Sequence, residues 1–246
     1  FDKRIYGAWI FDVFIWGGRD YLREYGWFIH ASDLPNGESR NDWSMTPQSN
    51  VFHGDCMDFM RQFPDGYFQL GVLDPPYGIN INMNMGRRKG EPKKHESKSW
   101  DKSAPDEAYF KEVFRVTQNQ IIWGGNYFGL PITKSWIFWD KNVPAGVSFA
   151  DGELAWTSFN KTLVKTVVPY SGFNGTIGKI HPTQKPIALY EWLLRNYAKP
   201  GDKILDTHMG SQSSRIAAYK WGFDYWGSEL DADYFRNGWE RFEKEI

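Results

Sequence analysis

Apolar residues recur along the chain at two spacings, which predict strands and helices. Between residues 56 and 63, Met57, Met60 and Phe63 stand at three-residue steps, the spacing of one face of a helix. The short apolar run Leu70-Gly71-Val72-Leu73 is typical of a buried strand. This part of the chain therefore predicts a helix followed by a strand that lies inside a sheet.

The same alternation continues to the end of the chain. The expected strands are 51–53, 70–73, 120–123, 135–139, 153–159, 203–205 and 225–227. The expected helices are 56–63, 104–117, 187–197, 211–220 and a last one from residue 231. Strands that alternate with helices form parallel sheets. We therefore expect an α/β three-layer sandwich with a mostly parallel, seven-stranded sheet, in which 153–159 is the one antiparallel hairpin strand.

Residues 1–48 have the least distinct pattern. The apolar segment 8–16 predicts a strand or a short helix, and segment 20–29 predicts a helix or a second strand. The run Leu34-Pro35-Asn36-Gly37 is a strong turn signal. We expect an N-terminal extension of unassigned role at 1–48 and one larger domain at 49–246.

Composition fits a globular domain, with 41% hydrophobic and 24% charged residues among 246. No apolar run approaches the roughly 18 residues of a membrane span. A single cysteine, Cys56, excludes an internal disulfide and a cysteine-rich zinc site, and it fits a reducing cytoplasm. The chain begins with Phe1 and no signal-peptide pattern follows, so we expect the translated product to begin earlier and to be cytoplasmic.

Charge is close to balanced overall, with a formal net charge of -1, so any nucleic-acid contact must be local. The polar segment 79–103 is rich in basic residues. It predicts either a flexible solvated loop or a loop that contacts phosphates, and one loop can be both if it becomes ordered on a nucleic acid. Segment 160–180 predicts a short exposed connection, with a role in target recognition as one option. The basic residues that we take as candidates for nucleic-acid binding are Arg87, Arg88, Lys89, Lys93 and Lys94.

The stretch Asp74-Pro75-Pro76-Tyr77-Gly78 directly follows the predicted strand at 70–73. Neither proline can donate to a sheet ladder, and Gly78 permits a turn that a residue with a Cβ would resist. The result is a rigid segment, the Asp74 lip (residues 74–78), which presents a carboxylate, an aromatic ring and backbone carbonyls that can only accept hydrogen bonds. Such a set suits a planar ring that carries an amino group. The alternative is an ordinary strand-to-turn connection with a capping Asp74.

A second candidate site spans residues 202–214, predicted as strand, tight loop and helix. Gly210 lets a ligand approach the backbone, and the helix N-terminus offers free N–H donors. Glu229 follows about 20 residues later, the spacing of an acid that accepts from ribose hydroxyls. The alternative is a plain turn with a helix cap at Ser211. His181 alone is more often a structural surface histidine than a ligand, and no second spaced histidine suggests a metal site.

Together, these motifs resemble the amino-methylating DNA methyltransferases. The shared elements are Asp-Pro-Pro-Tyr, then His-Pro-Thr-Gln-Lys-Pro, then Asp-x-x-x-Gly-Ser and a Gly-x-Glu acid, over residues 50–246. The order resembles the permuted β-type subgroup and, within it, phage or prophage adenine-N6 methylases. The resemblance implies a Rossmann-like fold, S-adenosylmethionine as cofactor and double-stranded DNA as partner, with a monomer or a homodimer both compatible.

The resemblance also implies roles for individual residues. The catalytic residues would be Asp74, Pro75, Pro76 and Tyr77, with the amine held by Asp74 and the Pro75 carbonyl and the base stacked on Tyr77. The family's ribose acid falls on Glu229. The implied cofactor-binding residues are Asp55, Cys56, Asp74, Thr183, Lys185, Asp206, Thr207, His208, Gly210, Ser211, Gln212, Glu229 and Leu230.

One departure from the family is serious. Gln212 stands where the family usually has a second loop glycine, so we expect its side chain to narrow or block the cofactor pocket. Adenine is expected over cytosine because the motif begins with Asp, which in this family resembles the adenine enzymes more often. The alternatives are cytosine-N4 methylation, an impaired homologue that only binds nucleic acid, and methylation of RNA or a small amine.

Overall fold

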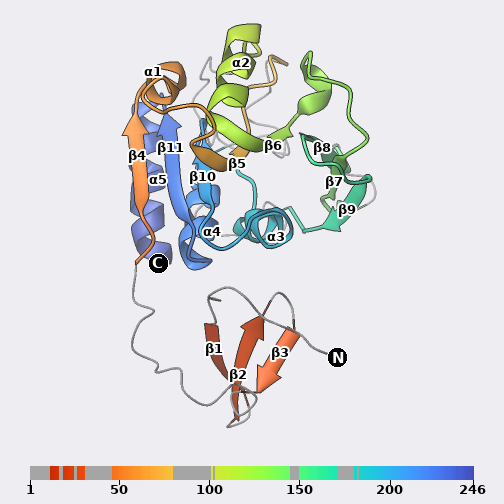
Figure 1. Cartoon of the computed structure of the whole chain (residues 1–246), viewed down its shortest axis with the longest axis vertical. Helices are drawn as coiled ribbons and strands as arrows, with labels where there is room; N and C mark the ends of the chain where they lie inside the picture. Colours follow the sequence, from red (N-terminus) through yellow and green to blue (C-terminus); the bar gives the residue numbers. More distant parts are fainter. Residues whose placement is uncertain are drawn as a thin grey trace, which may run out of the picture. The chain divides into compact units, whose positions relative to one another are not determined.

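A computed structural model of the chain describes residues 46–79, 101, 103–144, 150–170, 180–181 and 183–246, with the backbone of three N-terminal strands (Figure 1). The backbone divides into two compact units, Phe1–Pro47 and Gln48–Ile246. The predicted turn at 34–37, most of the basic segment and part of the 160–180 connection lie outside the described residues. The nucleic-acid candidates that lie outside them are Arg87, Arg88, Lys89, Lys93 and Lys94.

The N-terminal unit contains a small antiparallel sheet. Its strands are β1 (Asp12–Trp16), β2 (Arg19–Glu24) and β3 (Trp27–His30), in the order β1-β2-β3. Segment 8–16 therefore contains one strand, β1, and segment 20–29 contains most of two strands, β2 and β3, where a helix or a single strand was expected.

The larger unit is built on an eight-stranded sheet in the order β4-β11-β10-β5-β6-β8-β7-β9. Strand β8 is antiparallel to both of its neighbours, and every other pair is parallel, which confirms one antiparallel strand in a mostly parallel sheet. The strands are β4 (Ser49–His53), β5 (Phe68–Leu73), β6 (Thr117–Trp123), β7 (Trp136–Asp140), β8 (Gly152–Thr157), β9 (Val164–Val167), β10 (Lys203–Asp206) and β11 (Asp224–Glu229).

The prediction of seven strands is wrong, because β9 lies in the segment 160–180 that was expected to be a connection only. This edge strand has four residues, and Lys165 interrupts its apolar run. It pairs in parallel with β7, from Ile137↔Val164 to Asp140↔Val167. Strand β6 also begins earlier than expected, since its first residues are polar and leave no apolar signal.

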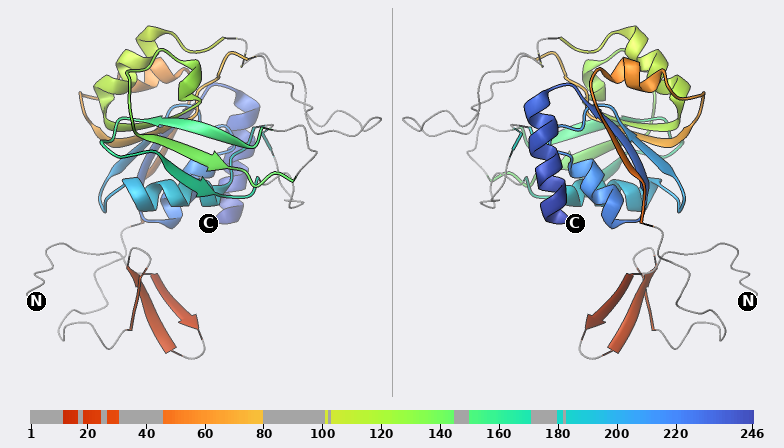
Figure 2. Two further views of the ribbon diagram at one scale, coloured as in Figure 1. Left: turned by 90° about the vertical axis from the view of Figure 1, so that its right-hand side faces the viewer. Right: turned by 90° about the vertical axis from the view of Figure 1, so that its left-hand side faces the viewer.

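Helices cover both faces of the sheet, which confirms the three-layer sandwich (Figure 2). Helices α3 and α4 pack with β6 and β10 residues in one apolar core, and α1 and α2 pack in a second core across the sheet. Among the described helices, none is long and apolar enough to cross a membrane. The helices are α1 (Cys56–Met60), α2 (Glu107–Val116), α3 (Ile187–Tyr197), α4 (Ser213–Lys220) and α5 (Ala232–Glu245), with a short 3-10 turn, η2 (Gly125–Tyr127).

The order of the strands brings the two candidate sites together. Strands β5 and β10 are parallel neighbours, with Ile204 opposite Leu70 and Leu205 opposite Gly71. Asp74 follows the end of β5, and the loop from Thr207 follows the end of β10. Both segments therefore leave the sheet at the same carboxyl edge, which is where ligands bind in open α/β sheets.

Candidate active site

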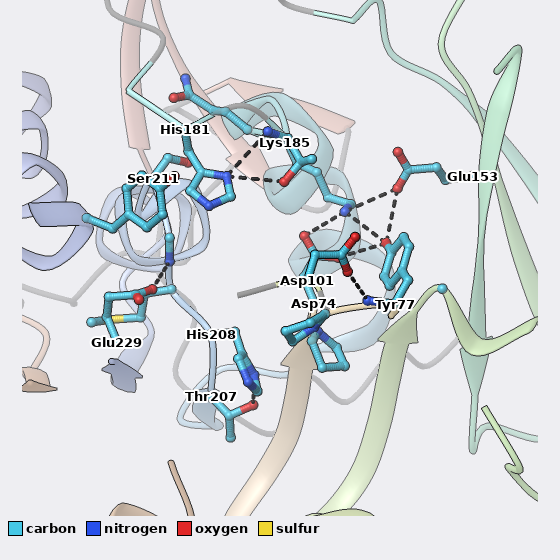
Figure 3. A pocket seen from close by; sticks show the side chains of 18 of the residues that line it. Asp74, Tyr77, Asp101, Glu153, His181, Lys185, Thr207, His208, Ser211 and Glu229 are labelled. Atoms are coloured by element: carbon cyan, nitrogen blue, oxygen red, sulfur yellow. Dashed lines mark hydrogen bonds and ion pairs between the residues drawn. The ribbon is translucent and has the colours of Figure 1, made fainter. Parts of the chain in front are cut away.

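One cavity of about 1230 Å³ lies at this carboxyl edge. Segments that follow β4, β5, β6, β10 and β11 line it, together with the start of β8. Because β8 is antiparallel, its first residues reach the same edge as the last residues of its neighbours. We call Asp74, Tyr77, Asp101, Glu153 and Lys185 the β5 side of the cavity (Figure 3). The β10 side consists of Asp55, Cys56, the loop Thr207–Ser211 with Asp206 beneath it, and Glu229.

The lip after β5 is held from the far end of the basic segment. The Oδ1 atom of Asp101, which is 5% exposed, accepts from the backbone N–H of Tyr77 at 2.9 Å and of Gly78 at 3.0 Å. Gly78 has φ +72°, and a Cβ there would come within 2.6 Å of the Ala104 nitrogen. The prediction that this turn requires glycine is therefore confirmed.

The Tyr77 ring is already packed within the protein. Its hydroxyl donates to Asp74 Oδ1 at 2.9 Å, and its ring stacks on Tyr127 with centroids 5.2 Å apart. A Cβ on Gly124 would overlap the same ring, so this glycine allows the close approach. A planar ring bound beside Asp74 would therefore meet a stack of two tyrosine rings, whereas the sequence suggested Tyr77 alone.

Ion pairs connect the catalytic candidate Asp74 to two other charged residues. Lys185 Nζ lies 2.6 Å from Asp74 Oδ2 and 3.1 Å from Glu153 Oε2, and Lys141 Nζ lies 2.6 Å from Glu153 Oε1. Burial opposes the charge on Glu153, but Lys185 and Lys141 outweigh it and lower the pKa of Glu153 to about 2. Burial likewise disfavours the charged lysine, yet Asp74 and Glu153 raise the pKa of Lys185. Glu153 and Lys185 are thus both ionised at neutral pH.

Asp206 does not line the cavity but holds the loop that does. It is 1% exposed, and its carboxylate accepts from the His208 backbone N–H at 3.0 Å and from the Ser214 hydroxyl at 2.5 Å. Burial raises the pKa of Asp206 to about 7 despite these hydrogen bonds. This acid therefore organises the loop from beneath, and the loop residues after it face the cavity.

Glu229 ties the loop to the end of β11. One carboxylate oxygen accepts from Gly210 N–H at 2.8 Å and the other accepts from Asp231 N–H at 2.9 Å. Burial raises the pKa of Glu229. Gly210 itself has φ +49°, a conformation that favours glycine, and the ring of His181 lies against it. His181 therefore forms part of the cavity wall and also packs on Tyr234.

Gln212 does not enter the cavity, so the expectation that it narrows or blocks the pocket is wrong. Its backbone takes the left-handed conformation of a glycine, with φ 59°, and its fully buried side chain turns towards α5. There its amide donates to the Phe235 carbonyl at 3.3 Å and accepts from Arg215 at 2.8 Å. The Gln212 side chain fits here because residue 238 is a glycine: a Cβ at that position would come within 2.7 Å of Gln212 Cγ.

Two further β10-side residues, Cys56 and His208, are kept neutral by burial. Burial, with the charge of Asp55 beside it, raises the pKa of Cys56 to about 12, so this residue is a thiol. Burial lowers the pKa of His208 to about 4, so its imidazole is neutral at pH 7. Asp55 caps α1 by accepting from Met57 N–H at 2.7 Å.

The cavity brings together nearly all of the residues predicted for it. Asp206 and Gln212 are the two that do not line it. Residues that the sequence analysis did not select include Asp101, Glu153 and Lys141. The only sequence signal for Glu153 is an acid at the start of an otherwise apolar strand. The predicted residues that line the cavity are Asp55, Cys56, Asp74, Pro75, Pro76, Tyr77, Thr183, Lys185, Thr207, His208, Gly210, Ser211, Glu229 and Leu230.

Known families give an independent comparison. Residues 122–239 match the model of the N6/N4 methyltransferase family, described as DNA methylase. Among curated proteins, the chain is 26% identical over 208 residues to the methylase YubD of Escherichia coli strain K12, covering 78% of this chain and 89% of YubD. It is 23% identical over 245 residues to the type II methyltransferase M2.MboI of Moraxella bovis, covering 79% and 88%.

Solved structures agree on the fold. The cytosine-N4-specific PvuII DNA methyltransferase matches with a TM-score of 0.54 at 15% identity, over 81% of this chain and 91% of that chain. The complex of M1.HpyAVI with S-adenosylmethionine matches with a TM-score of 0.52 at 18% identity, over 78% and 98%. The fold is thus the Rossmann-like fold of S-adenosylmethionine-dependent methyltransferases. The family match and the two relatives support the class of amino-methylating DNA methyltransferases.

Proposed function

We propose that this chain transfers a methyl group from S-adenosylmethionine to the exocyclic amine of a base in DNA, with adenine N6 as the acceptor. One observation carries the proposal. The Asp74 lip and the glycine loop after β10 leave adjacent parallel strands and open into the same cavity. The family match and the two curated methylases support the same class of reaction.

The residues of the β10 side fit the proposed cofactor. The cavity, about 1230 Å³, exceeds the roughly 300–1,000 Å³ of ordinary ligand pockets and has room for a cofactor and a base. Gly210 offers backbone without a side chain, and Glu229 and Asp55 supply acceptors. When bound, S-adenosylmethionine supplies an electrophilic methyl group on a positively charged sulfur. Asp55, Gly210, Glu229 and Leu230 would hold it.

The residues of the β5 side would hold the amine. Asp74 and the Pro75 carbonyl accept from the amine hydrogens, which points the nitrogen lone pair towards the methyl group. If the methyl group passed from the donor to the amine nitrogen, the donor would leave as a neutral thioether, and the Asp74 carboxylate would lie beside the amine to accept the proton that it loses. The base must leave the duplex to reach this position, and we propose that it stacks on Tyr77 and Tyr127. Alignment is then the main source of rate.

Transfer of labelled methyl from S-adenosylmethionine to duplex DNA, followed by separation of the nucleosides, tests the proposal. We expect label in N6-methyldeoxyadenosine and a loss of at least about 10²-fold in rate for the isosteric variant Asp74→Asn. Label in N4-methyldeoxycytidine instead would favour the cytosine reaction, which the match to a cytosine-N4-specific enzyme fold keeps as the second candidate. No label in either nucleoside would contradict the proposal.

DNA contact by the basic segment is a proposal from sequence alone. Replacing Arg87, Arg88 and Lys89 by alanine should weaken duplex binding. Each lost phosphate contact should also flatten the slope of log affinity against log salt by about 0.9. An unchanged slope would mean that the segment is only solvated, and RNA or a small amine would become better substrates to test.

Two further proposals concern the subgroup of the family and the biological role. The Asp74 lip precedes the glycine loop along the chain, which supports the permuted β-type order. M2.MboI is a type II methyltransferase, which supports a role in restriction-modification. A phage or prophage origin, a cytoplasmic location and the choice between monomer and homodimer stay predictions.

A further inference from the structure

A chain of four charges crosses the β5 side of the cavity. Lys141 pairs with Glu153, Glu153 pairs with Lys185, and Lys185 pairs with Asp74. Figure 3 shows the Lys185 ammonium between the Glu153 carboxylate and the Asp74–Tyr77 pair. The four side chains come from the end of β7, the start of β8, the segment before α3 and the end of β5. The chain of ion pairs thus fastens three other segments to the catalytic candidate.

Burial makes these pairs interdependent. The side chain of Lys185 is 4% exposed and that of Lys141 is 12% exposed, while Glu153 and Asp74 are 24% and 20% exposed. A buried charge is costly unless it is paired, and here two cations balance two anions. Removal of one member would leave a neighbouring charge without its partner.

The pairs also determine how Asp74 faces the cavity. Its Oδ1 accepts from the Tyr77 hydroxyl at 2.9 Å, and its Oδ2 accepts from Lys185 at 2.6 Å. Each carboxylate oxygen can accept two hydrogen bonds, so one position on each oxygen is left for a substrate. Two donors, one of them charged, fix the plane of the carboxylate before any base arrives.

Glu153 changes what Lys185 does to Asp74. A lysine paired only with Asp74 would neutralise the carboxylate that must face an amine gaining positive charge during transfer. Glu153 pairs with the same ammonium and balances part of its positive charge. The lysine can therefore orient Asp74 without fully neutralising its carboxylate. Glu153 also lies 3.3 Å from the Tyr77 hydroxyl, so it contacts both groups that touch Asp74.

We propose that Lys185 and Glu153 are positioning residues for the amine site, acting as a pair that orients the Asp74 carboxylate. This inference rests on the proposed function and assigns Lys185 to the amine, whereas the resemblance to the family placed it with the cofactor. Neither residue is required to touch the methyl donor.

The test compares Lys185→Met, Glu153→Gln and the double variant in three measurements. These are the single-turnover rate of methyl transfer to duplex DNA, the Kd for S-adenosylmethionine by calorimetry, and the thermal unfolding midpoint. Each single variant leaves an unbalanced charge, so both the midpoint and the rate should fall, the rate by about 10²-fold, as expected for a misplaced catalytic group. The Kd should stay within about threefold, because the β10 side is untouched.

The double variant separates positioning from simple stability. It leaves both Lys141 and Asp74 without their partners, so the unfolding midpoint should fall at least as far as in either single variant. The rate should nevertheless stay near that of Lys185→Met, about 10²-fold below the wild type, because Asp74 lacks the same lysine donor in both variants. Lys165→Met is the matched control, because this lysine also pairs with an acid, Asp140, but neither lines the cavity. Its rate should equal that of the wild type.

Two results would overturn this inference but leave the proposed function standing. One is a double variant whose rate falls below that of Lys185→Met in step with its lower stability. The other is single variants that transfer methyl at the wild-type rate. Absence of transfer by the wild type under the same conditions would overturn the proposed function and this inference with it.

Discussion

The two sides of the cavity handle buried charge in opposite ways. On the β5 side, Lys185 and Glu153 pair with each other and with their neighbours, so both stay ionised, and the pKa of Glu153 falls to about 2. On the β10 side, the acids are held mainly by backbone and hydroxyl groups. Burial raises the pKa of Asp206 to about 7 and also raises that of Glu229.

This difference indicates what each side is built to receive. Paired charges are already oriented and need no ligand to balance them, which suits the alignment of a neutral amine. Burial pushes Asp206 and Glu229 towards the neutral form, and no lysine or arginine in the described part of the chain forms an ion pair with either acid. A positively charged ligand would stabilise their ionised form. We therefore expect the β10 side to favour a cationic cofactor, in agreement with the proposed S-adenosylmethionine.

The largest expected effect is a pH dependence of stability with opposite sign on the two sides. Folded Asp206 keeps its proton up to about pH 7, whereas the unfolded side chain loses it near 3.8. The folded state binds more protons in this window, so the free energy of unfolding falls as pH rises from about 4 to 7. In the wild type this decrease in the free energy of unfolding should be roughly 4 kcal/mol, at about 1.4 kcal/mol per pKa unit, and in Asp206→Asn it should be absent.

Glu153→Gln is the matched comparison from the β5 side. The lowered pKa of Glu153 contributes stability that is present above its ordinary value of 4.5 and is lost as pH falls towards 2. The cost of this variant should therefore be greatest above pH 5 and shrink in acid. Urea unfolding from pH 3 to 8 measures both differences from the wild type. If the two differences change with pH in the same direction, the contrast between the sides is wrong.

A second, smaller effect concerns Asp101, which holds the Asp74 lip by two backbone hydrogen bonds. Asp101→Ala removes the acceptor of two backbone N–H groups, which should cost about 1–3 kcal/mol of stability and slow methyl transfer. Asp101→Asn keeps the accepting Oδ1 atom and should stay close to the wild type in both properties. Urea unfolding and single-turnover rates test this. Equal behaviour of the Ala and Asn variants would count against the hydrogen bonds as the cause.

The smallest effect tests where the Gln212 side chain lies. Alanine is favoured over glycine within a helix by about 1 kcal/mol, but at position 238 a Cβ would meet Gln212 Cγ at 2.7 Å. Gly238→Ala should therefore fail to stabilise the wild type, because overpacking costs about 1–3 kcal/mol. In the Gln212→Gly background the same change should stabilise by about 1 kcal/mol. The same effect in both backgrounds would place the Gln212 side chain elsewhere.

Local sequence signals were sufficient for much of the fold. Helix α3 has the predicted limits, Ile187–Tyr197, because Pro186 defines its start and its apolar face is continuous. The strand that leads to Asp74 was equally clear from its apolar run. Strand β9 was missed because an edge strand buries few side chains and therefore needs few apolar residues.

The site was predictable only where its residues follow strands directly. Asp74 and Glu229 were found because each ends a predicted strand. Asp101 and Glu153 act through partners distant in the sequence, and no local pattern marks such contacts. For Gln212 the sequence showed the missing glycine but not the space that Gly238 provides in α5. That compensation exists only in the folded chain.

Calorimetric titration of S-adenosylmethionine into the purified protein, with Gln212→Gly alongside, tests most directly whether the β10 side accepts the cofactor. Because the Gln212 side chain is buried against α5 and does not line the cavity, we expect micromolar binding by the wild type. The variant should match it within about threefold, as expected for a side chain that does not contact the ligand. Absence of binding by the wild type, with recovery in Gln212→Gly, would contradict the account.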